Sequence, residues 1–260
     1  MDTLTSEDGT TIAYETSGDG PVLVTSVGLF CDRGTTAGLA AILASEFSVV
    51  RYDRRGRGDS GDSPEYAPER EIEDLAAVIA AAGGSAMVYG HSSGAVLALE
   101  GVARGLPITK IAAYEPPYTI EGSRAPKPGF AARITALIAD GRRADAVVAF
   151  MTGTGMPQEQ ARQITQGPWW PSMERLVPTM VYDLALVGDE VGVPKRFADI
   201  DVPTLVLDGG ESDDWARTAV AEVAALVPGG RRVSVPGQNH QVADDVLAPI
   251  LAEFFRGQRA

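Results

Sequence analysis

Residues Gly90-His91-Ser92-Ser93-Gly94 match the pattern G-x-S-x-G, and the segments on either side give this match its structural meaning. Met87-Val88-Tyr89 is a short apolar run typical of a buried parallel strand, and residues 95–103 are rich in helix-forming residues. A sharp turn between a strand and a helix is the context in which such a serine exposes its hydroxyl at the end of a sheet. We therefore interpret Ser92 as a candidate nucleophile, with Gly90 and Gly94 allowing close packing around it.

Segments with strand character alternate with helical segments on both sides of this stretch. Strands are predicted at 22–27, 47–52, 108–114, 203–207 and 231–235, and an antiparallel hairpin is predicted near residues 10–14. Helices are predicted at 35–45 and 68–82, and a last helix carries Val246 to Phe255. The alternation predicts an α/β fold, with a mostly parallel central sheet and helices on both faces.

The middle of the chain has a different character. From about Tyr118 to Asp199 the pattern contains helical periodicity but no good strand, and regular strand signals return only after it. We therefore expect a core formed by residues 1–118 and 199–260, with residues 119–198 inserted as a helical cap.

Composition excludes several classes of partner. The formal net charge of -13 should repel nucleic acids and anionic membrane surfaces. A single cysteine and two histidines leave no intrachain disulfide and no Cys/His zinc cluster of the usual kind, so we expect no cofactor and no metal. The N-terminus lacks the pattern of a signal peptide, and no run of roughly 18 apolar residues occurs. We expect a cytoplasmic protein whose oligomeric state the sequence leaves open.

A serine hydroxyl needs a base at neutral pH, and histidine is the side chain suited to that task. His91 directly precedes Ser92, so its side chain should point away from the nucleophile, and we interpret it as structural. His240 lies in a loop between the last strand and the last helix. Chain order therefore favours His240 as the general base.

Three features together resemble the α/β-hydrolase superfamily: residues 90–94, the turn Asp53-Arg54-Arg55-Gly56-Arg57-Gly58-Asp59-Ser60, and the late His240. The resemblance covers nearly the full length. It implies the α/β-hydrolase fold, a catalytic triad of serine, histidine and an acid, and attack on an acyl carbon. The superfamily also includes non-hydrolytic enzymes. The arginine-rich turn recurs in relatives as a structural element paired with nearby acids, an interpretation we favour over recognition of an anionic substrate.

The acid of the triad has more than one candidate. The superfamily usually carries it in a G-x-x-D pattern after the strand at 205–207, but counting from Gly209 leads to Ser212. Asp213 and Asp208 lie close to that position. A second location in some relatives directly follows the strand that corresponds to residues 108–114 here, where Glu115 stands. The segment Glu115-Pro116-Pro117 and the missing acid look similar to the zearalenone lactonase type of lactone and ester hydrolases. We favour Glu115 and keep Asp213 and Asp208 as alternatives.

Further site residues follow from the same resemblance. The oxyanion hole should use backbone N–H groups of Ser93 and of the turn at Gly28 and Leu29, although Val27 stands where many relatives have a histidine. For substrate contact we select Phe30, Met151, Trp169 and Trp170, because the cap holds more aromatic and methionine side chains than its core should need.

The expected function is that of a serine hydrolase. It would cleave an ester or lactone of an apolar or aromatic small molecule through an acyl-enzyme on Ser92. Two alternatives stay open: a non-hydrolytic enzyme of the same fold (a lyase, cyclase or perhydrolase), and a ligand-binding receptor with little turnover.

Overall fold

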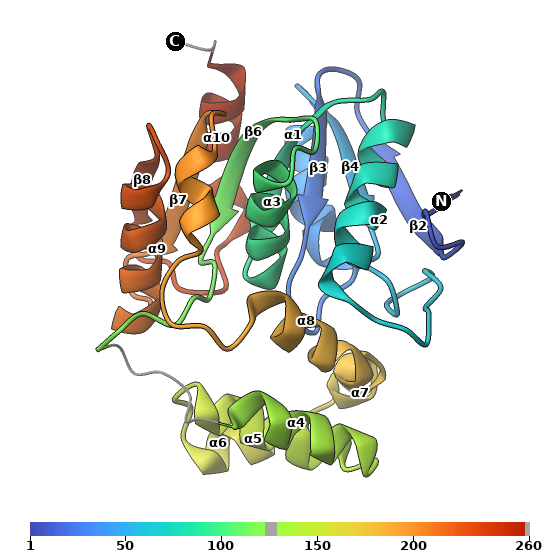
Figure 1. The fold of residues 1–260 in the computed structure, drawn as a ribbon, viewed down its shortest axis with the longest axis vertical. Helices are drawn as coiled ribbons and strands as arrows, with labels where there is room; N and C mark the ends of the chain where they lie inside the picture. Colours follow the sequence, from blue (N-terminus) through green and yellow to red (C-terminus); the bar gives the residue numbers. More distant parts are fainter. Residues whose placement is uncertain (123–128, 258–260) are drawn as a thin grey trace.

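In the computed structural model of the chain, residues 1–122 and 129–257 are described. Their central element is an eight-stranded sheet with the order β1-β2-β4-β3-β5-β6-β7-β8 (Figure 1). The strand β1 pairs antiparallel with β2, and β2 pairs antiparallel with β4, whereas all other pairs are parallel. The strands are β1 (Asp2–Thr5), β2 (Thr11–Ser17), β3 (Val22–Ser26), β4 (Ser48–Tyr52), β5 (Ala86–His91), β6 (Ile108–Tyr114), β7 (Thr204–Gly209) and β8 (Arg231–Val235).

Helices cover both faces of the sheet. Buried apolar residues of α2, α3 and α9 form one hydrophobic cluster with one face, and those of α1 and α10 form a second cluster with the other face. These core helices are α1 (Ala37–Leu43), α2 (Pro68–Ala81), α3 (Ser93–Ala103), α9 (Asp214–Leu226) and α10 (Asp244–Arg256). The prediction of a mostly parallel sheet between helices is confirmed, and the N-terminal hairpin is present as β1 and β2.

The remaining helices lie beyond the carboxyl ends of the parallel strands. Figure 1 shows α4, α5 and α6 grouped below the sheet, with α7 and α8 nearer to it. A third hydrophobic cluster holds this helical segment together. Its members are α4 (Phe130–Ala139), α5 (Arg143–Gly153), α6 (Gln158–Ile164), α7 (Trp170–Leu176) and α8 (Met180–Val187). All five helices fall inside the range predicted for the cap, and residues 123–128 of that range lie outside the described residues, as do residues 258–260 of the predicted core.

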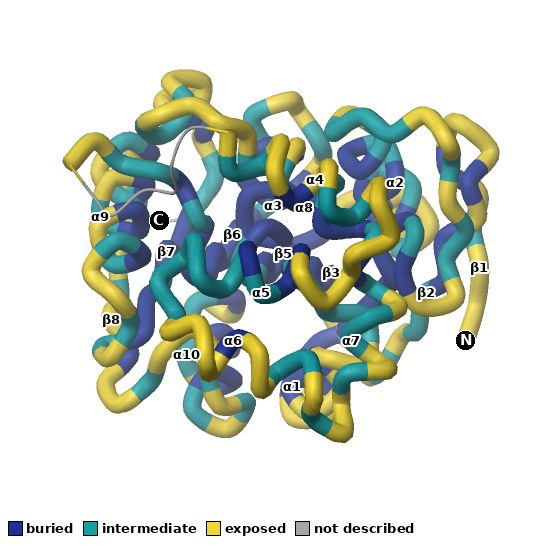
Figure 2. The backbone as a smooth tube through the Cα atoms, turned by 90° about the horizontal axis from the view of Figure 1, so that it is seen from below, coloured by how far each residue is buried: buried dark blue, intermediate teal, exposed yellow. Residues whose placement is uncertain are grey.

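Short 3-10 helices complete the described elements: η1 (Arg33–Thr36), η2 (Val177–Thr179) and η3 (Lys195–Asp199). Seen from the side of the helical segment, buried residues lie around β5 and β6, and exposed residues lie both at the rim and in front of the centre (Figure 2). Within the described ranges, no helix combines the length and the apolar character that crossing a membrane requires.

Local sequence explains where the core helices begin and end. Pro68 occupies the start of α2, where its fixed φ suits a helix and its missing N–H is not needed, and Glu69 and Glu71 lie in the first turn, where negative charge is favourable. Gly83 and Gly84, both with positive φ, follow the end of this helix. The chain then returns directly into β5, which leads to the candidate site.

Candidate active site

Ser92 lies on the sharp turn between β5 and α3. Its φ of 56° and ψ of -124° are strained for a residue with a side chain. A Cβ on Gly94 would come within 2.2 Å of the Ser26 carbonyl oxygen, and a Cβ on Gly90 within 2.5 Å of Ala95 Cα. Neither position could accept a side chain without movement of the backbone, so the packing role predicted for the two glycines is confirmed.

A carboxylate and an imidazole meet at the carboxyl end of the sheet. His240 Nδ1 lies 2.6 Å from Glu115 Oε2, and Glu115 is only 1% exposed. The other carboxylate oxygen, Oε1, accepts hydrogen bonds from the backbone N–H of Gly209 at 2.8 Å and from Ser212 Oγ. Burial by itself raises the pKa of Glu115, but the bonds from His240, Gly209 and Ser212 outweigh it, and the pKa lies below its usual value. Glu115 is therefore held as an ionised acceptor for the ring.

The other acids considered from the sequence lie elsewhere. Asp208 is buried within β7, where it accepts from Arg232 Nε at 2.7 Å and from Ser234 Oγ at 2.8 Å. Asp213 immediately precedes α9, and its carboxylate makes no hydrogen bond or ion pair with a described residue. Among residues 1–122 and 129–257, Glu115 is thus the carboxylate that contacts the ring of His240.

Two side chains at the ends of β5 and β6 hold the loop that carries His240. His91 Nε2 lies 2.8 Å from the backbone oxygen of His240, and Tyr114 Oη donates to the oxygen of Asn239 at 2.6 Å. The rings of His91 and His240 are 4.7 Å apart between centroids. Burial and the neighbouring ring lower the pKa of His91 to about 4, so it is neutral at pH 7 and donates from Nε2. His91 is thus structural here, and its hydrogen bond holds the His240 backbone next to the turn that carries Ser92.

No hydrogen bond joins Ser92 Oγ to His240 Nε2 in the described structure. His240 Nε2 and Ser92 Oγ also have no other hydrogen-bond partner among the described residues, and the His240 side chain is 46% exposed. In structures without substrate, the bond between nucleophile and base is often long and tightens only when substrate is bound.

The turn after β3 lies against the nucleophile. A Cβ on Gly28 would come within 2.8 Å of Ser92 Cβ and 3.2 Å of Ser92 Oγ, so only glycine fits here. The backbone N–H groups of Leu29 and Ser93 donate to no described residue. They are available as donors next to Ser92, which is the arrangement an oxyanion hole needs.

Three residues other than glycine have positive φ in the described ranges, and all three belong to the predicted site. They are Phe30 at 60°, Ser92 at 56° and Glu115 at 46°. Such conformations cost on the order of 1–3 kcal/mol each and tend to concentrate at functional sites. The strain therefore falls on the turn of the candidate oxyanion donors, on the candidate nucleophile and on the candidate acid.

The arginine-rich turn is buried and paired with acids. Arg54, Arg55 and Arg57 are each 1% exposed. Their ion pairs are Arg54–Glu71, Arg55–Asp74, Arg55–Asp8, Arg54–Asp183 and Arg57–Asp183. The interpretation of this turn as a structural element is confirmed. Asp183 was not predicted as a partner, although a lone acid in the apolar run Met180–Val187 was a signal for a buried ion pair.

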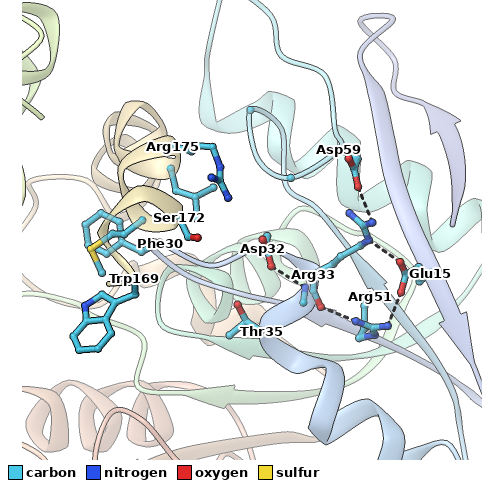
Figure 3. Close-up of a pocket in the computed structure, with 15 residues that line it drawn as sticks. Glu15, Phe30, Asp32, Arg33, Thr35, Arg51, Asp59, Trp169, Ser172 and Arg175 are labelled. Carbon is cyan, nitrogen blue, oxygen red and sulfur yellow. Dashed lines mark hydrogen bonds and ion pairs between the residues drawn. The ribbon is translucent and has the colours of Figure 1, made fainter. Parts of the chain in front are cut away.

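A cavity of about 860 Å³ opens between η1 and α7 (Figure 3). Phe30 and Trp169, two of the residues selected for substrate contact, line it together with Met173 and Leu176, whereas Ser92, Glu115 and His240 do not. The opposite wall is charged, and Arg33, Glu15, Arg51 and Asp59 pair there with one another. Met151 and Trp170 do not line this cavity, and both pack partly buried in the hydrophobic cluster of the helical segment.

No group of three or more His, Cys, Asp or Glu side chains within 1–122 and 129–257 is arranged to hold a metal ion.

Ser212 was not predicted from the sequence as a donor to Glu115. Its position in the place of the usual acid was the available signal.

Comparison with known proteins gives consistent results. A sequence model of the alpha/beta hydrolase family matches residues 25–249. No curated protein matches the chain. An alpha/beta hydrolase from Sphaerobacter thermophilus DSM 20745 is 51% identical, with a TM-score of 0.92 over 98% of this chain and 100% of that one.

More distant structures share the fold. The enol-lactonase from Burkholderia xenovorans LB400 is 21% identical, with a TM-score of 0.72 over 98% of this chain and 100% of that one. A thermophilic esterase from Thermogutta terrifontis is 20% identical, with a TM-score of 0.75 over 98% of this chain and 97% of that one. At these identities the likeness is one of fold.

Proposed function

The chain belongs to the alpha/beta hydrolase family, and on that premise we propose that it hydrolyses a carboxylic ester or lactone through an acyl-enzyme on Ser92. One observation carries the proposal: a buried carboxylate, Glu115, bonds to the ring of His240, whose loop is tied to the residue before Ser92. An imidazole oriented in this way has its Nε2 lone pair free to accept the proton of a serine hydroxyl.

The reaction follows from these positions. Ser92 Oγ attacks the acyl carbon while His240 Nε2 takes the hydroxyl proton, and the carbonyl oxygen becomes an oxyanion that accepts from the N–H groups of Leu29 and Ser93. Collapse of this intermediate breaks the ester bond, and His240 returns the proton to the leaving alcohol oxygen. Water then attacks the acyl-enzyme with His240 as base, which releases the acid and restores Ser92.

Glu115 has a supporting part in both steps. Its ionised carboxylate holds Nδ1–H of His240, selects the tautomer with Nε2 unprotonated, and stabilises the imidazolium after proton transfer. The depressed pKa of Glu115 agrees with this part, because a carboxylate that stays ionised remains an acceptor.

The substrate class is inferred from the cavity and from related proteins. Ser92 and His240 do not line the cavity, but Phe30, two residues after Gly28, does. Phe30, Trp169 and Met173 give the cavity an apolar, partly aromatic wall. Trp169 is 58% exposed, so its ring is accessible to a ligand in this cavity. Two structures of similar fold are named as an esterase and an enol-lactonase. We propose a small molecule with an apolar or aromatic acyl part as substrate.

The test is a panel of p-nitrophenyl esters and macrocyclic lactones, assayed with the unmodified protein and with Ser92→Ala. Ser45→Ala, a substitution of a remote exposed serine, is the control. We expect turnover and fluorophosphonate labelling to disappear in Ser92→Ala only.

Two results would contradict the proposal and favour an alternative. Absence of turnover on all acyl donors, with labelling of Ser92 retained, would favour a non-hydrolytic enzyme such as a lyase, cyclase or perhydrolase. Slow labelling by substrate in a single turnover would favour a receptor.

A further inference from the structure

The peptide group that joins Gly28 to Leu29 is held from its carbonyl side. Gly28 O accepts a hydrogen bond from Arg57 Nη1 at 2.5 Å and one from the backbone N–H of Cys31 at 3.3 Å. In a trans peptide the C=O and the following N–H point in opposite directions within one plane. With Gly28 O directed at Arg57, the N–H of Leu29 is therefore directed away from Arg57, in a turn whose Gly28 lies against Ser92.

Arg57 is itself fixed by an acid from the helical segment. Its Nη2 donates to Asp183 Oδ2 at 2.7 Å, and Asp183 on α8 is 4% exposed. The second carboxylate oxygen, Oδ1, accepts from Arg54 Nη1 at 2.9 Å and from Ser93 Oγ. One carboxylate thus contacts the arginine that holds Gly28 and also contacts Ser93, whose N–H is the second free donor beside Ser92.

We propose that Arg57, held by Asp183, is a positioning residue for the oxyanion hole. This inference rests on the proposed function and adds to it the group that replaces the histidine seen in many relatives before the glycine of this turn. Arg57 fixes the plane of the peptide group between Gly28 and Leu29, and the Leu29 N–H is thereby directed at the developing oxyanion. Asp183 brings the turn and the elbow into one buried network.

The consequence should appear in the chemical step. Preorganised donors stabilise the transition state far more than the bound substrate, so an incorrectly directed N–H lowers kcat with little effect on KM. Loss of a complete oxyanion donor costs roughly 10²–10³ in kcat. A donor that is still present but less well directed should cost about 10–10².

The test compares two arginines of the same turn. Arg57→Lys keeps the positive charge but offers one nitrogen in place of the two that contact Gly28 O and Asp183. Arg55→Lys is the matched control, because Arg55 is equally buried and also ion-paired, with Asp74 and Asp8, but does not contact the turn at Gly28. We expect Arg57→Lys to lower kcat about 10–10²-fold, with KM within about 3-fold. The affinity for a boronic acid transition-state analogue should fall by the same factor as kcat/KM.

Asp183→Asn is the second variant, since it keeps the shape of the side chain but removes the charge that holds Arg57. It should give the same selective loss of kcat. If circular dichroism shows that Arg57→Lys is unfolded, the kcat of Asp183→Asn tests the positioning role instead. Equal kcat in Arg57→Lys and Arg55→Lys would overturn the proposal, as would loss of folding in both Arg57→Lys and Asp183→Asn. Neither result affects the proposed function, which is tested separately by the substrate panel with Ser92→Ala.

Discussion

The ends of β6 and β7 lie side by side, but they contribute different groups to the site. Their register pairs Tyr114 with Leu207, so the acids that follow, Glu115 and Asp208, come at equivalent positions of neighbouring strands. Glu115 contacts the ring of His240, whereas Asp208 contacts Arg232 and a serine of β8. Two acids at one level of the sheet therefore have different roles.

Backbone conformation explains the difference. Asp208 is still within β7, so its side chain follows the alternation of a strand. Glu115 has already left β6, and its φ of 46° breaks that alternation and directs its side chain toward His240. The last residue of β7 and the loop after it contribute donors in place of an acid, namely Gly209 N–H and Ser212 Oγ. The backbone conformation of the residue that follows a strand, more than the strand itself, therefore decides which carboxylate contacts the ring of His240.

The largest effect is expected from removing the charge at the end of β6. Glu115→Gln should lower kcat by about 10⁴, the size of the effect known for the acid of serine protease triads, because the amide stabilises the wrong tautomer of His240. Asp213→Asn should leave kcat within about 2-fold, because Asp213 makes no contact with the ring. Steady-state kinetics on one p-nitrophenyl ester compares the two variants, and a reversal of these effects would identify Asp213 as the acid.

A second prediction moves the acid from one strand to the other. The double variant Glu115→Ser with Ser212→Asp places a carboxylate after β7 and a hydroxyl after β6, in a region where the two side chains already touch. We expect kcat to recover to within about 10² of the unmodified protein, since a misplacement of about 1 Å can cost 10²-fold. The reference is Glu115→Ser alone. No gain over this single variant would mean that the loop after β7 cannot direct an acid at His240.

A third prediction concerns the donors. Ser212→Ala removes one hydrogen bond to the Glu115 carboxylate, which should raise the pKa of Glu115 and lower kcat about 10-fold, since such bonds to charged groups contribute about 1.5–3 kcal/mol. Ser234→Ala is the matched control, because Ser234 donates in the same way to Asp208. Ser234→Ala should reduce the free energy of unfolding about as much as Ser212→Ala does and leave kcat unchanged. Equal losses of kcat in the two variants would show that the effect is not specific to the acid of β6.

Much of this arrangement could be predicted from the sequence, because it depends on local patterns. The turn at residues 90–94 requires glycines for steric reasons, and the apolar periodicity of residues 68–82 defines a helix that the structure places at Pro68–Ala81. The predicted strand at 108–114 coincides with β6. These features are determined by neighbours within one or two turns of chain.

The contacts that could not be predicted join residues far apart in sequence. Arg57 and Asp183 are separated by 126 positions, and Ser212 and Glu115 by 97. No local pattern specifies which buried acid meets which buried arginine, because that depends on how α8 packs against α3. The substrate contact selected for Met151 and Trp170 stays a prediction, since their apolar character suits the hydrophobic cluster in which they pack as well as a cavity wall.

The smallest expected effect concerns β5, the neighbour of β6 on the other side, and it appears in stability. His91 has a pKa of about 4 in the folded protein and about 6.5 in an unfolded chain. Between these values the unfolded chain binds a proton that the folded protein does not. The contribution of His91 to stability is therefore complete above about pH 6.5 and is lost progressively as the pH falls toward 4.

His91→Gln separates this titration from the hydrogen bond to the His240 loop, because glutamine keeps a donor but does not titrate in this range. His91 is partly exposed, so we expect the free energy of unfolding to fall by only about 1–2 kcal/mol more in the unmodified protein than in His91→Gln between pH 7.5 and pH 5. Urea unfolding at the two pH values measures the difference. If the free energy of unfolding falls equally in the unmodified protein and in His91→Gln, the ring of His91 is protonated as easily in the folded protein as in the unfolded chain. In that case β5 would hold the base loop through a charged donor, whereas β6 does so through the neutral hydroxyl of Tyr114.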